Sequence, residues 1–387
     1  MSFEVYIHVP WCQHKCPYCN FNVYVEKDPP FVQWMEQILW DWKWHQNQFD
    51  GTPRSIYFGG GTPSLMPPKY LTKIINTIAM SNDISNTISN TISNTMEITI
   101  EVNPENATAE LLQQYKDMGI NRISLGVQTF QPQTAKILGR SSSVKQNRRA
   151  ISLVQEKEFS SWSFDLIFGV ANQTMDGLLA DLKEIAHIKP PHVSLYGLTY
   201  KENTALYQAL KRGQIQEISE DLWTRMFDTI TQTLFDLGYE RYEVSNFSLP
   251  GHRAKHNEAI WKNGYYAGLG PGAHGFLPTG IRTEQPSIWS QWLQKKGPHL
   301  DLPTPEQQVW DILLTSIRHC DGIDLRNLKR LGYAIEKPNS QSQNCDWVND
   351  WLHWSENQIQ LRNMGWIMVD WITQQLIDRL YTIPISI

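Results

Sequence analysis

The sequence predicts an α/β fold: a partial parallel (β/α)6 barrel followed by a smaller α+β C-terminal domain. Short β-branched and aromatic runs alternate with helical patterns from the start of the chain through residue 198. Most of these runs lack a strict alternation of apolar and polar residues, as expected for strands buried on both faces. This rhythm stops after a long helical pattern at residues 220–238, where loop-rich sequence begins. Six β/α units in series are typical of a parallel sheet that curls into a barrel.

The predicted elements follow one another with few interruptions. Helical patterns lie between the strands, for example at residues 30–46 and at residues 108–119, where Gly119 stops the pattern. The stretch at residues 359–381 resembles a small strand-and-helix module. We therefore divide the chain into a core domain of residues 1–236 and a C-terminal domain of residues 237–387. The six predicted strands are residues 3–9, 54–60, 96–102, 122–127, 164–169 and 192–198.

Composition and charge exclude several classes of protein. The 387 residues are 41% hydrophobic and 19% charged, which is ordinary for a soluble protein with a large core. The net charge of −5 and the lack of a Lys/Arg-rich run argue against a nucleic-acid partner. No apolar stretch reaches the roughly 18 to 20 residues that span a bilayer. The chain opens on a strand pattern that leaves no room for a signal peptide, so we expect a cytoplasmic protein with reduced thiols.

Two compositional features stand apart from the predicted core. Residues 81–95 repeat Ile-Ser-Asn-Thr, a low-complexity segment that we interpret as a surface loop expansion without function. The chain also has sixteen tryptophans, several of which are grouped at residues 34–44 and 347–354. Helix faces packed into a core are the simpler explanation. A flat aromatic ligand such as a porphyrin is the alternative that the tryptophans leave open.

Three of the five cysteines, Cys12, Cys16 and Cys19, lie together in the segment CQHKCPYC, directly after the first strand. Cys320 and Cys345 are isolated. A C-x3-C-x2-C spacing on one loop lets three thiolates converge on a metal centre. A zinc site with His8 or His14 as fourth ligand is one interpretation. A [4Fe–4S] cluster normally takes four cysteines, so three would leave one iron open to bind a small molecule.

The cysteine segment resembles the radical S-adenosylmethionine (SAM) superfamily, in which an aromatic residue, here Tyr18, precedes the third cysteine. The resemblance implies that Cys12, Cys16 and Cys19 hold a [4Fe–4S] cluster. It also implies that the open iron chelates the methionine part of SAM, which an electron from the cluster cleaves to a 5′-deoxyadenosyl radical.

Polar residues and glycines recur at the predicted strand ends, where parallel barrels place their chemistry. The segment YFGGGTPS follows the second strand, and its glycines allow close approach of backbone to a ligand. The superfamily's loop for the cofactor's amino group is similar to this segment. The anaerobic coproporphyrinogen oxidases and their relatives bind the cofactor at matching positions. The resemblance thus implies a set of SAM contacts: Tyr6, Tyr18, Gly60, Gly61, Thr62, Glu101, Gln128, Arg140 and Asp165.

Three further segments, YEVSNFSLPGH, HNEAIW and GLGPGAHG, resemble the HemW branch of this group, a family of heme chaperones. The oxidases carry a fourth cysteine two residues after the third, where this chain has Phe21. They also carry a longer N-terminal extension. The branch has a His-Asn-x-x-Tyr-Trp motif linked to heme binding, here His256 to Trp261 with Ile260 in the tyrosine place. The resemblance implies that His256 contacts heme, with His252 and His274 as lesser candidates.

The main functional hypothesis is therefore a heme chaperone that binds heme and transfers it to an acceptor protein, with a cluster, SAM and an external electron donor. The alternative is an oxygen-independent coproporphyrinogen III oxidase, which Phe21 disfavours. A radical enzyme that modifies RNA fits poorly with the acidic balance of the chain. No catalytic residue is assigned.

Overall fold

The computed structural model describes residues 2–80, 96–294, 296–338 and 346–384. The repeat at residues 81–95 and Cys345 lie outside these ranges. Among the described residues, no helix is both long and apolar enough to cross a membrane.

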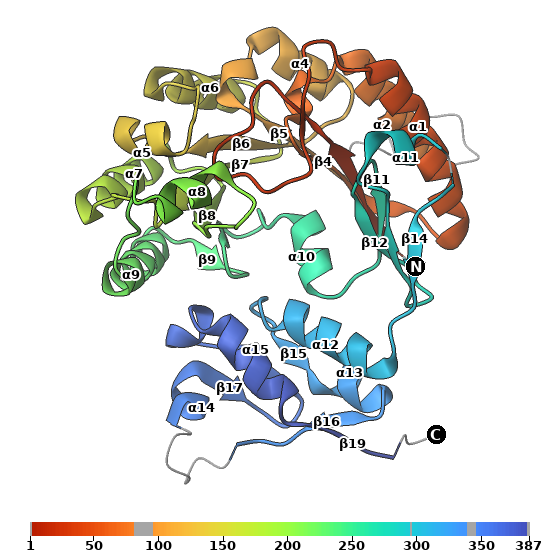
Figure 1. Cartoon of the computed structure of the whole chain (residues 1–387), viewed down its shortest axis with the longest axis vertical. Helices are drawn as coiled ribbons and strands as arrows, with labels where there is room; N and C mark the ends of the chain where they lie inside the picture. The colour runs from red at the N-terminus through yellow and green to blue at the C-terminus, as the bar shows by residue number, and fades with distance from the viewer. Residues whose placement is uncertain (1, 81–95, 295, 339–345, 385–387) are drawn as a thin grey trace.

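Six neighbouring parallel strands form the barrel part of the fold, in the order of the sequence, and the predicted partial parallel barrel is confirmed. Helices lie on the convex outer side of these strands (Figure 1). The strands are β1 (Phe3–Val9), β4 (Pro53–Gly60), β5 (Glu97–Val102), β6 (Arg122–Gln128), β7 (Ser161–Phe168) and β8 (His192–Gly197). The main helices are α1 (Phe31–His45), α2 (Pro68–Met80), α4 (Ala109–Asp117), α6 (Val144–Glu156), α7 (Met175–Ile188) and α9 (Glu220–Asp236), with the shorter α5 (Pro132–Ile137) and α8 (Ala205–Lys211).

The two faces of the barrel strands differ in chemistry although both are largely buried. Val5, Ile7 and Ile56 belong to the apolar core between strands and helices. Their neighbours Glu4 and Ser55 contact each other on the opposite face, inside the barrel. Because side chains alternate along a strand, one face supplies the hydrophobic core and the other supplies a polar interior. The strands were thus correctly predicted as buried on both faces, but the inner face is polar.

Local sequence signals account for where the outer helices begin. Thr108, Thr174 and Ser219 cap α4, α7 and α9 by accepting a backbone N–H bond. Ser143 and Gln146 form a reciprocal capping box at the start of α6. Such caps satisfy N–H groups that have no partner within the helix, each contributing roughly 1 kcal/mol.

The sheet continues beyond α9 at both of its edges and has twelve strands among the residues that the structure describes. At one edge β10 (Asn246–Ser248) pairs antiparallel with β8 and with β9 (Glu240–Arg241). At the other edge β11 (Tyr266–Leu269) pairs parallel with β1. Three antiparallel strands then extend that edge: β12 (His274–Phe276), β13 (Arg282–Glu284) and β14 (His299–Asp301), with the short α11 (Trp289–Trp292) between the last two.

A separate C-terminal unit has its own core, built from side chains between Val309 and Leu376. The core of the large sheet includes residues as far as Trp292. The two cores divide the chain after β14, whereas the predicted boundary near residue 236 marks the end of the parallel repeats. The elements of the unit are α12 (Pro305–Ser316), β15 (Ile323–Asp324), α13 (Leu325–Arg330), β16 (Tyr333–Ile335), α14 (Asp346–Trp351), β17 (Leu352–Trp354), β18 (Gln358–Leu361), α15 (Val369–Ile377) and β19 (Leu380–Thr382).

The two groups of tryptophans mainly pack in these cores. Trp34 and Trp42 are buried on α1, and Trp347 is buried in the core of the C-terminal unit. No described tryptophan lines the pocket at the carboxyl ends of the barrel strands, which is described next. The simpler explanation of the tryptophans therefore holds for these three.

Candidate cofactor site

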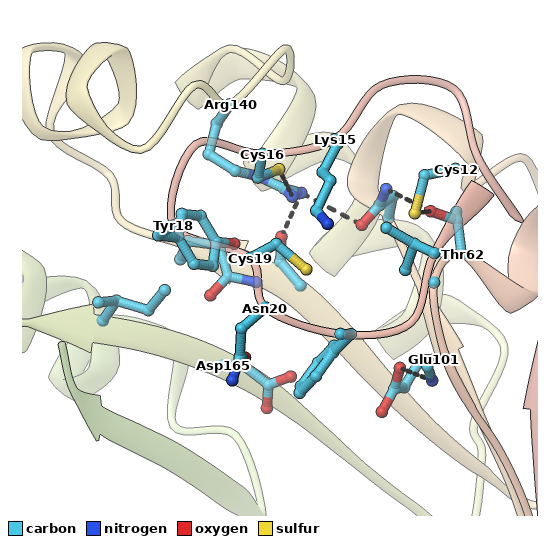
Figure 2. A pocket seen from close by; sticks show the side chains of 18 of the residues that line it. Cys12, Lys15, Cys16, Tyr18, Cys19, Asn20, Thr62, Glu101, Arg140 and Asp165 are labelled. Carbon is cyan, nitrogen blue, oxygen red and sulfur yellow. Dashed lines mark hydrogen bonds between the residues drawn. The ribbon is translucent and has the colours of Figure 1, made fainter. Parts of the chain in front are cut away.

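The three clustered cysteines lie on one loop at the carboxyl end of β1. A short parallel ladder between β2 (Trp11–Cys12) and β3 (Tyr24–Val25) closes the base of this loop. A tight turn follows, in which the Cys19 backbone N–H donates to the Cys16 carbonyl at 3.0 Å. The loop passes over the ends of the barrel strands, and all three cysteines line the same pocket (Figure 2).

Contacts from distant parts of the chain hold this cysteine loop in place. Tyr18 packs against a small apolar cluster formed by Leu138, Ile167 and Val170. On the other side of the loop, the Asn22 side-chain amide donates to the carbonyls of Pro271 and Ser287, each at 3.0 Å. Pro271 belongs to the segment GLGPGAHG, so that segment anchors the cysteine loop.

The surroundings of the thiols suit an iron-bound thiolate better than a free one. Burial raises the pKa of the Cys12 thiol to about 11, although Thr62 Oγ1 donates to its sulfur at 3.4 Å. The Arg140 guanidinium lies 3.8 Å from the Cys16 sulfur. Metal binding deprotonates cysteine and offsets the cost of burying the charge. These three thiols therefore fit a metal cluster.

The hydrogen bonds of His8 argue against this residue as the fourth ligand of a zinc site. The His8 Nε2 atom lies 2.8 Å from the Asn22 carbonyl and its Nδ1 atom 3.1 Å from the Tyr6 hydroxyl. Both ring nitrogens are thus engaged. His14 Nε2 lies 3.8 Å from the Cys16 sulfur, but it donates to the Gly139 carbonyl at 3.1 Å.

The glycine segment after β4 packs directly against the start of the cysteine loop. The backbone N–H groups of Gly61 and Thr62 donate to the carbonyls of Val9 and Trp11, at 2.7 and 2.8 Å. A Cβ atom on Gly61 would lie 2.7 Å from the Trp11 carbonyl oxygen. Gly60 has a φ of +110°, which disfavours any residue with a side chain. Glycine is therefore required here for the close approach of two backbones.

Two carboxylates, Glu101 and Asp165, lie on the floor of the pocket (Figure 2). Glu101 accepts from the Tyr57 hydroxyl at 2.8 Å and from the Gly60 N–H at 3.2 Å. Burial, followed by the nearby Asp165, raises the pKa of Glu101 to about 7. Burial also raises the pKa of Asp165 to about 6. Neither carboxylate has an ion-pair partner among the described residues, so a cationic ligand would relieve their desolvation.

Arg140 and Gln128 form the wall of the pocket at the end of β6. The Arg140 guanidinium donates to Asn103 Oδ1 at 3.2 Å and to the Gly126 carbonyl at 2.9 Å. Gln128 has a φ of 67°, in the left-handed region, at an irregularity in the pairing of β6 with β7. Such backbone strain in a non-glycine residue is frequent at binding sites.

Most of the predicted site residues meet in one pocket of about 360 Å³. The glycines and polar strand-end residues were predicted separately, and the barrel brings them together beneath the cysteine loop. The pocket also includes Lys15, Asn103 and Lys201, which the sequence analysis missed. Asn103 directly follows the third predicted strand and could have been found by the strand-end rule. The predicted residues in the pocket are Cys12, Cys16, Tyr18, Cys19, Gly60, Gly61, Thr62, Glu101, Gln128, Arg140 and Asp165.

Tyr6 does not line the pocket, contrary to the prediction. Its ring lies inside the barrel, 6.2 Å from the Tyr57 ring. Since His8 Nε2 faces the Asn22 carbonyl, Nδ1 is the ring atom that accepts from the Tyr6 hydroxyl. Tyr6 thus supports the cysteine loop through His8 from a position three residues before the end of its strand.

His256 also lies outside the pocket, together with His252 and His274. It belongs to α10 (Lys255–Trp261), which lies between the barrel strands and the C-terminal unit (Figure 1). The residue is 2% exposed, because its ring packs under Tyr57 inside the barrel. The sequence motif could not indicate this burial, which depends on where α10 meets the amino ends of the strands.

Comparison with known proteins identifies the family to which the chain belongs. Residues 6–185 match the radical SAM superfamily. The chain is 34% identical over 279 residues to the heme chaperone HemW of Lactococcus lactis, covering 72% of this chain and 70% of that protein. It is 34% identical over 317 residues to HemW of Haemophilus influenzae, covering 78% and 80%. It is 30% identical over 306 residues to the mitochondrial radical S-adenosyl methionine domain-containing protein 1 of Danio rerio, covering 76% and 67%.

A solved structure shares the fold over almost the whole chain. Coproporphyrinogen III oxidase HemN from Escherichia coli, a radical SAM enzyme, superposes with a TM-score of 0.77. The match covers 96% of this chain and 89% of that one, at 17% sequence identity. At this identity the similarity concerns the fold alone.

Proposed function

Because the chain belongs to the HemW family within the radical SAM superfamily, we propose that it binds heme and passes it to an acceptor protein. The proposal includes a [4Fe–4S] cluster and SAM as resident cofactors. One observation carries it: three cysteines, a glycine segment and two unpaired carboxylates line a single pocket at the carboxyl ends of the barrel strands. Parallel barrels bind their ligands at this end.

Cys12, Cys16 and Cys19 are proposed as the cluster ligands. A bound cluster with one open iron supplies a site for the methionine part of SAM and a source of one electron. Arg140, 3.8 Å from the Cys16 sulfur, would balance part of the negative charge of the thiolates. Thr62 would continue to donate to the Cys12 sulfur.

SAM carries a sulfonium and an ammonium group, and both suit the pocket floor. Glu101 and Asp165 are half-buried carboxylates without an ion-pair partner among the residues that the structure describes. Gly60 and Gly61 line the same pocket, where the absence of side chains lets their backbone pack against the cysteine loop. We assign the remaining SAM contacts to Tyr18, Thr62, Gln128 and Arg140, which line the same pocket.

The mouth of the pocket suits the ring and the carboxylates of heme. Phe21, Val23 and Leu198 contribute apolar surface to its wall, and Phe21 is 59% exposed. Lys15 and Lys201 line the same opening and could pair with propionates. The predicted heme contact of His256 has no such support, because its buried ring lies outside this pocket.

Phe21 also separates the proposed function from the oxidase alternative. It stands where the oxidases carry a fourth cysteine, and a phenyl ring cannot ligate a metal or exchange a proton. The wall that it contributes is apolar, which favours binding of a flat ligand over chemistry at that position.

The test is one anaerobic preparation with a reconstituted cluster, divided between two assays. We expect heme to bind with a Soret shift and to move to an apo-cytochrome added afterwards. We expect no conversion of coproporphyrinogen III in the presence of SAM and a strong reductant. Phe21→Asp should weaken heme binding because it places a charge on the apolar wall. Phe235→Asp, at an exposed phenylalanine on α9, is the matched control.

Either assay can refute the proposal. Steady formation of protoporphyrinogen would make the oxidase the better assignment. A preparation with full cluster content that shows no Soret shift would rule out heme as the ligand.

A further inference from the structure

Three aromatic rings lie together directly beneath the floor of the cofactor pocket. The His256 ring stacks on Tyr57 with a centroid distance of 5.0 Å and an interplanar angle of 29°. It also contacts Tyr6, at a centroid distance of 6.4 Å. The Tyr57 hydroxyl donates to Glu101 at 2.8 Å. The position of the Glu101 carboxylate thus depends on Tyr57, and the ring of Tyr57 rests on His256.

Hydrogen bonds fix the His256 ring in one orientation and one tautomer. The Ser55 hydroxyl donates its single hydrogen to the Glu4 carboxylate. Ser55 Oγ therefore accepts at its second contact, which joins it to His256 Nδ1 at 2.8 Å. His256 carries its proton on Nδ1 and, since burial lowers its pKa to about 3, the ring is neutral.

The backbone of His256 is held as firmly as its ring. The N–H groups of Lys255 and His256 each donate to the Glu97 carboxylate at 3.2 Å, at the first turn of α10. Glu97 and Ser55 are paired residues on neighbouring strands. Both contacts of His256 are therefore made to the strands that end at the pocket.

We infer that His256 is a positioning residue, which sets the Glu101 carboxylate for SAM through the stacked ring of Tyr57. The inference rests on the proposed function, since it requires SAM to bind at Glu101. According to this inference, the histidine of HNEAIW affects the cofactor pocket through the Tyr57 side chain and does not contact heme iron.

The remaining ring nitrogen agrees with this role. His256 Nε2 has no hydrogen-bond partner among the described residues and is closed off from solvent. A heme iron could reach it only after α10 left the barrel. The ring as it stands can act by packing, and the side chain that it packs on touches the pocket floor.

The experiment measures SAM affinity by anaerobic titration of protein with a reconstituted cluster. We expect His256→Ala to weaken SAM binding about tenfold, because Tyr57 loses its support and its bond to Glu101 loosens. Tyr57→Phe keeps the stacked ring and removes only the hydroxyl, so it should weaken SAM by a similar factor even if His256→Ala folds poorly. His299→Ala, at an exposed histidine on β14, is the matched control and should bind like the wild type.

A double-mutant cycle separates positioning from a general loss of structure. If His256 acts through Glu101, the double variant with Glu101→Gln should bind SAM no more weakly than Glu101→Gln alone. Multiplication of the two single losses would overturn the inference. Heme affinity should remain at the wild-type value in His256→Ala, whereas a lost Soret shift would restore the iron-ligand assignment.

The remaining outcomes distinguish this inference from the proposed function. If wild-type protein with a full cluster does not bind SAM, the proposed function fails and the inference falls with it. If the wild type binds SAM, and His256→Ala and Tyr57→Phe bind it equally well, only the positioning role is refuted.

Discussion

Carboxylates at the two ends of the barrel differ in their partners, as Glu101 and Asp165 at one end and Glu258 at the other show. At the carboxyl ends of the strands, Glu101 and Asp165 have no ion-pair partner among the described residues, and burial raises the pKa of both. At the amino ends, next to the C-terminal unit, Glu258 on α10 meets Arg253 and Lys262 at 3.2 and 3.0 Å. The hydrogen bond from His319, followed by those cations, lowers the pKa of Glu258 to about 2 despite burial.

This difference separates a binding site from a structural junction. A desolvated carboxylate that lacks a cation destabilises the protein, and in a pocket a cationic ligand can supply the missing charge. A carboxylate surrounded by cations already has its partners and stabilises the contact between two parts of the fold. The carboxylates of the pocket are therefore suited to a cationic ligand, whereas Glu258 at the junction already has cationic partners.

The same contrast explains why a second group with metal-binding side chains is not proposed as a site. His319, Cys320 and Asp321 lie within ligating distance of one another at the junction. The backbone N–H of Asp321 donates to His319 Nδ1 at 3.0 Å, and Lys262 pairs with the Asp321 carboxylate at 2.8 Å. The donor atoms are already engaged by protein hydrogens and cations.

The largest expected effect is loss of the cluster from the pocket end. Cys16→Ala should abolish a four-iron cluster after anaerobic reconstitution, because two remaining thiols on the loop cannot hold it. Cys12→Ala and Cys19→Ala should do the same. Iron content and the absorption spectrum measure the result.

Cys320→Ala is the control from the junction end and should keep full iron content. The Cys345→Ala variant, at a position outside the described residues, is predicted to behave in the same way. Full iron content in Cys16→Ala would refute the cluster assignment and with it the contrast between the two ends.

The next effect concerns Glu101 in protein without ligands. Because its pKa is raised from 4.5 to about 7 in the folded state, the unfolded state releases this proton first as pH rises. The contribution of Glu101 to the free energy of unfolding should fall between pH 4.5 and 7 by about 2 to 3 kcal/mol and level off above pH 7. Glu101→Gln should remove this contribution and leave that of Asp165, whose pKa is also raised. Urea unfolding of metal-free wild type and variant at several pH values measures the difference. An unchanged pH profile would contradict the assignment of Glu101 as an unpaired carboxylate.

Glu258 should show the opposite dependence at the other end. Its pKa is lowered from 4.5 to about 2, so its contribution to stability is complete above pH 4.5 and disappears as pH falls toward 2. Solvent screening of this half-buried group limits the effect to about 1 kcal/mol. Glu258→Gln should reduce the stability at pH 7 by that amount and flatten the acid limb of the unfolding curve. Equal acid sensitivity of variant and wild type would place the stabilising charges elsewhere.

The barrel and most of the pocket could be predicted because their signals are local. Short β-branched runs gave the six strands, and polar residues at strand ends met in one pocket because parallel strands end at one edge of the sheet. The roles of Tyr6 and His256 could not be predicted in this way. Tyr6 faces inward but lies too far from the strand end, and His256 reaches the interior only through the packing of α10 after two hundred intervening residues.

The division of the chain was also beyond local signals. The end of the parallel repeats near residue 236 is visible in the sequence, but the pairing of β11 with β1 joins residues more than two hundred and fifty positions apart. Strands of three or four residues are too short to show a clear hydrophobic pattern in the sequence. Their place in the sheet depends on the unpaired edges of the first and last barrel strands.

The smallest predicted effect concerns the strained backbone of Gln128 at the pocket end. Its φ of 67° costs a residue with a side chain about 1 kcal/mol, and glycine avoids this cost. Gln128→Gly should therefore be more stable than Gln128→Ala by roughly 1 kcal/mol in urea unfolding, although both lose the same polar group. Both variants should bind SAM more weakly than the wild type, because the amide lines the pocket.

A matched pair of variants, Glu158→Gly and Glu158→Ala, changes an exposed residue with a φ of 51° at the end of α6. This pair should show the same stability difference without any change in SAM affinity. If the Gln128 variants bind SAM like the wild type, the strain at this position belongs to the fold of β6 and not to the binding site.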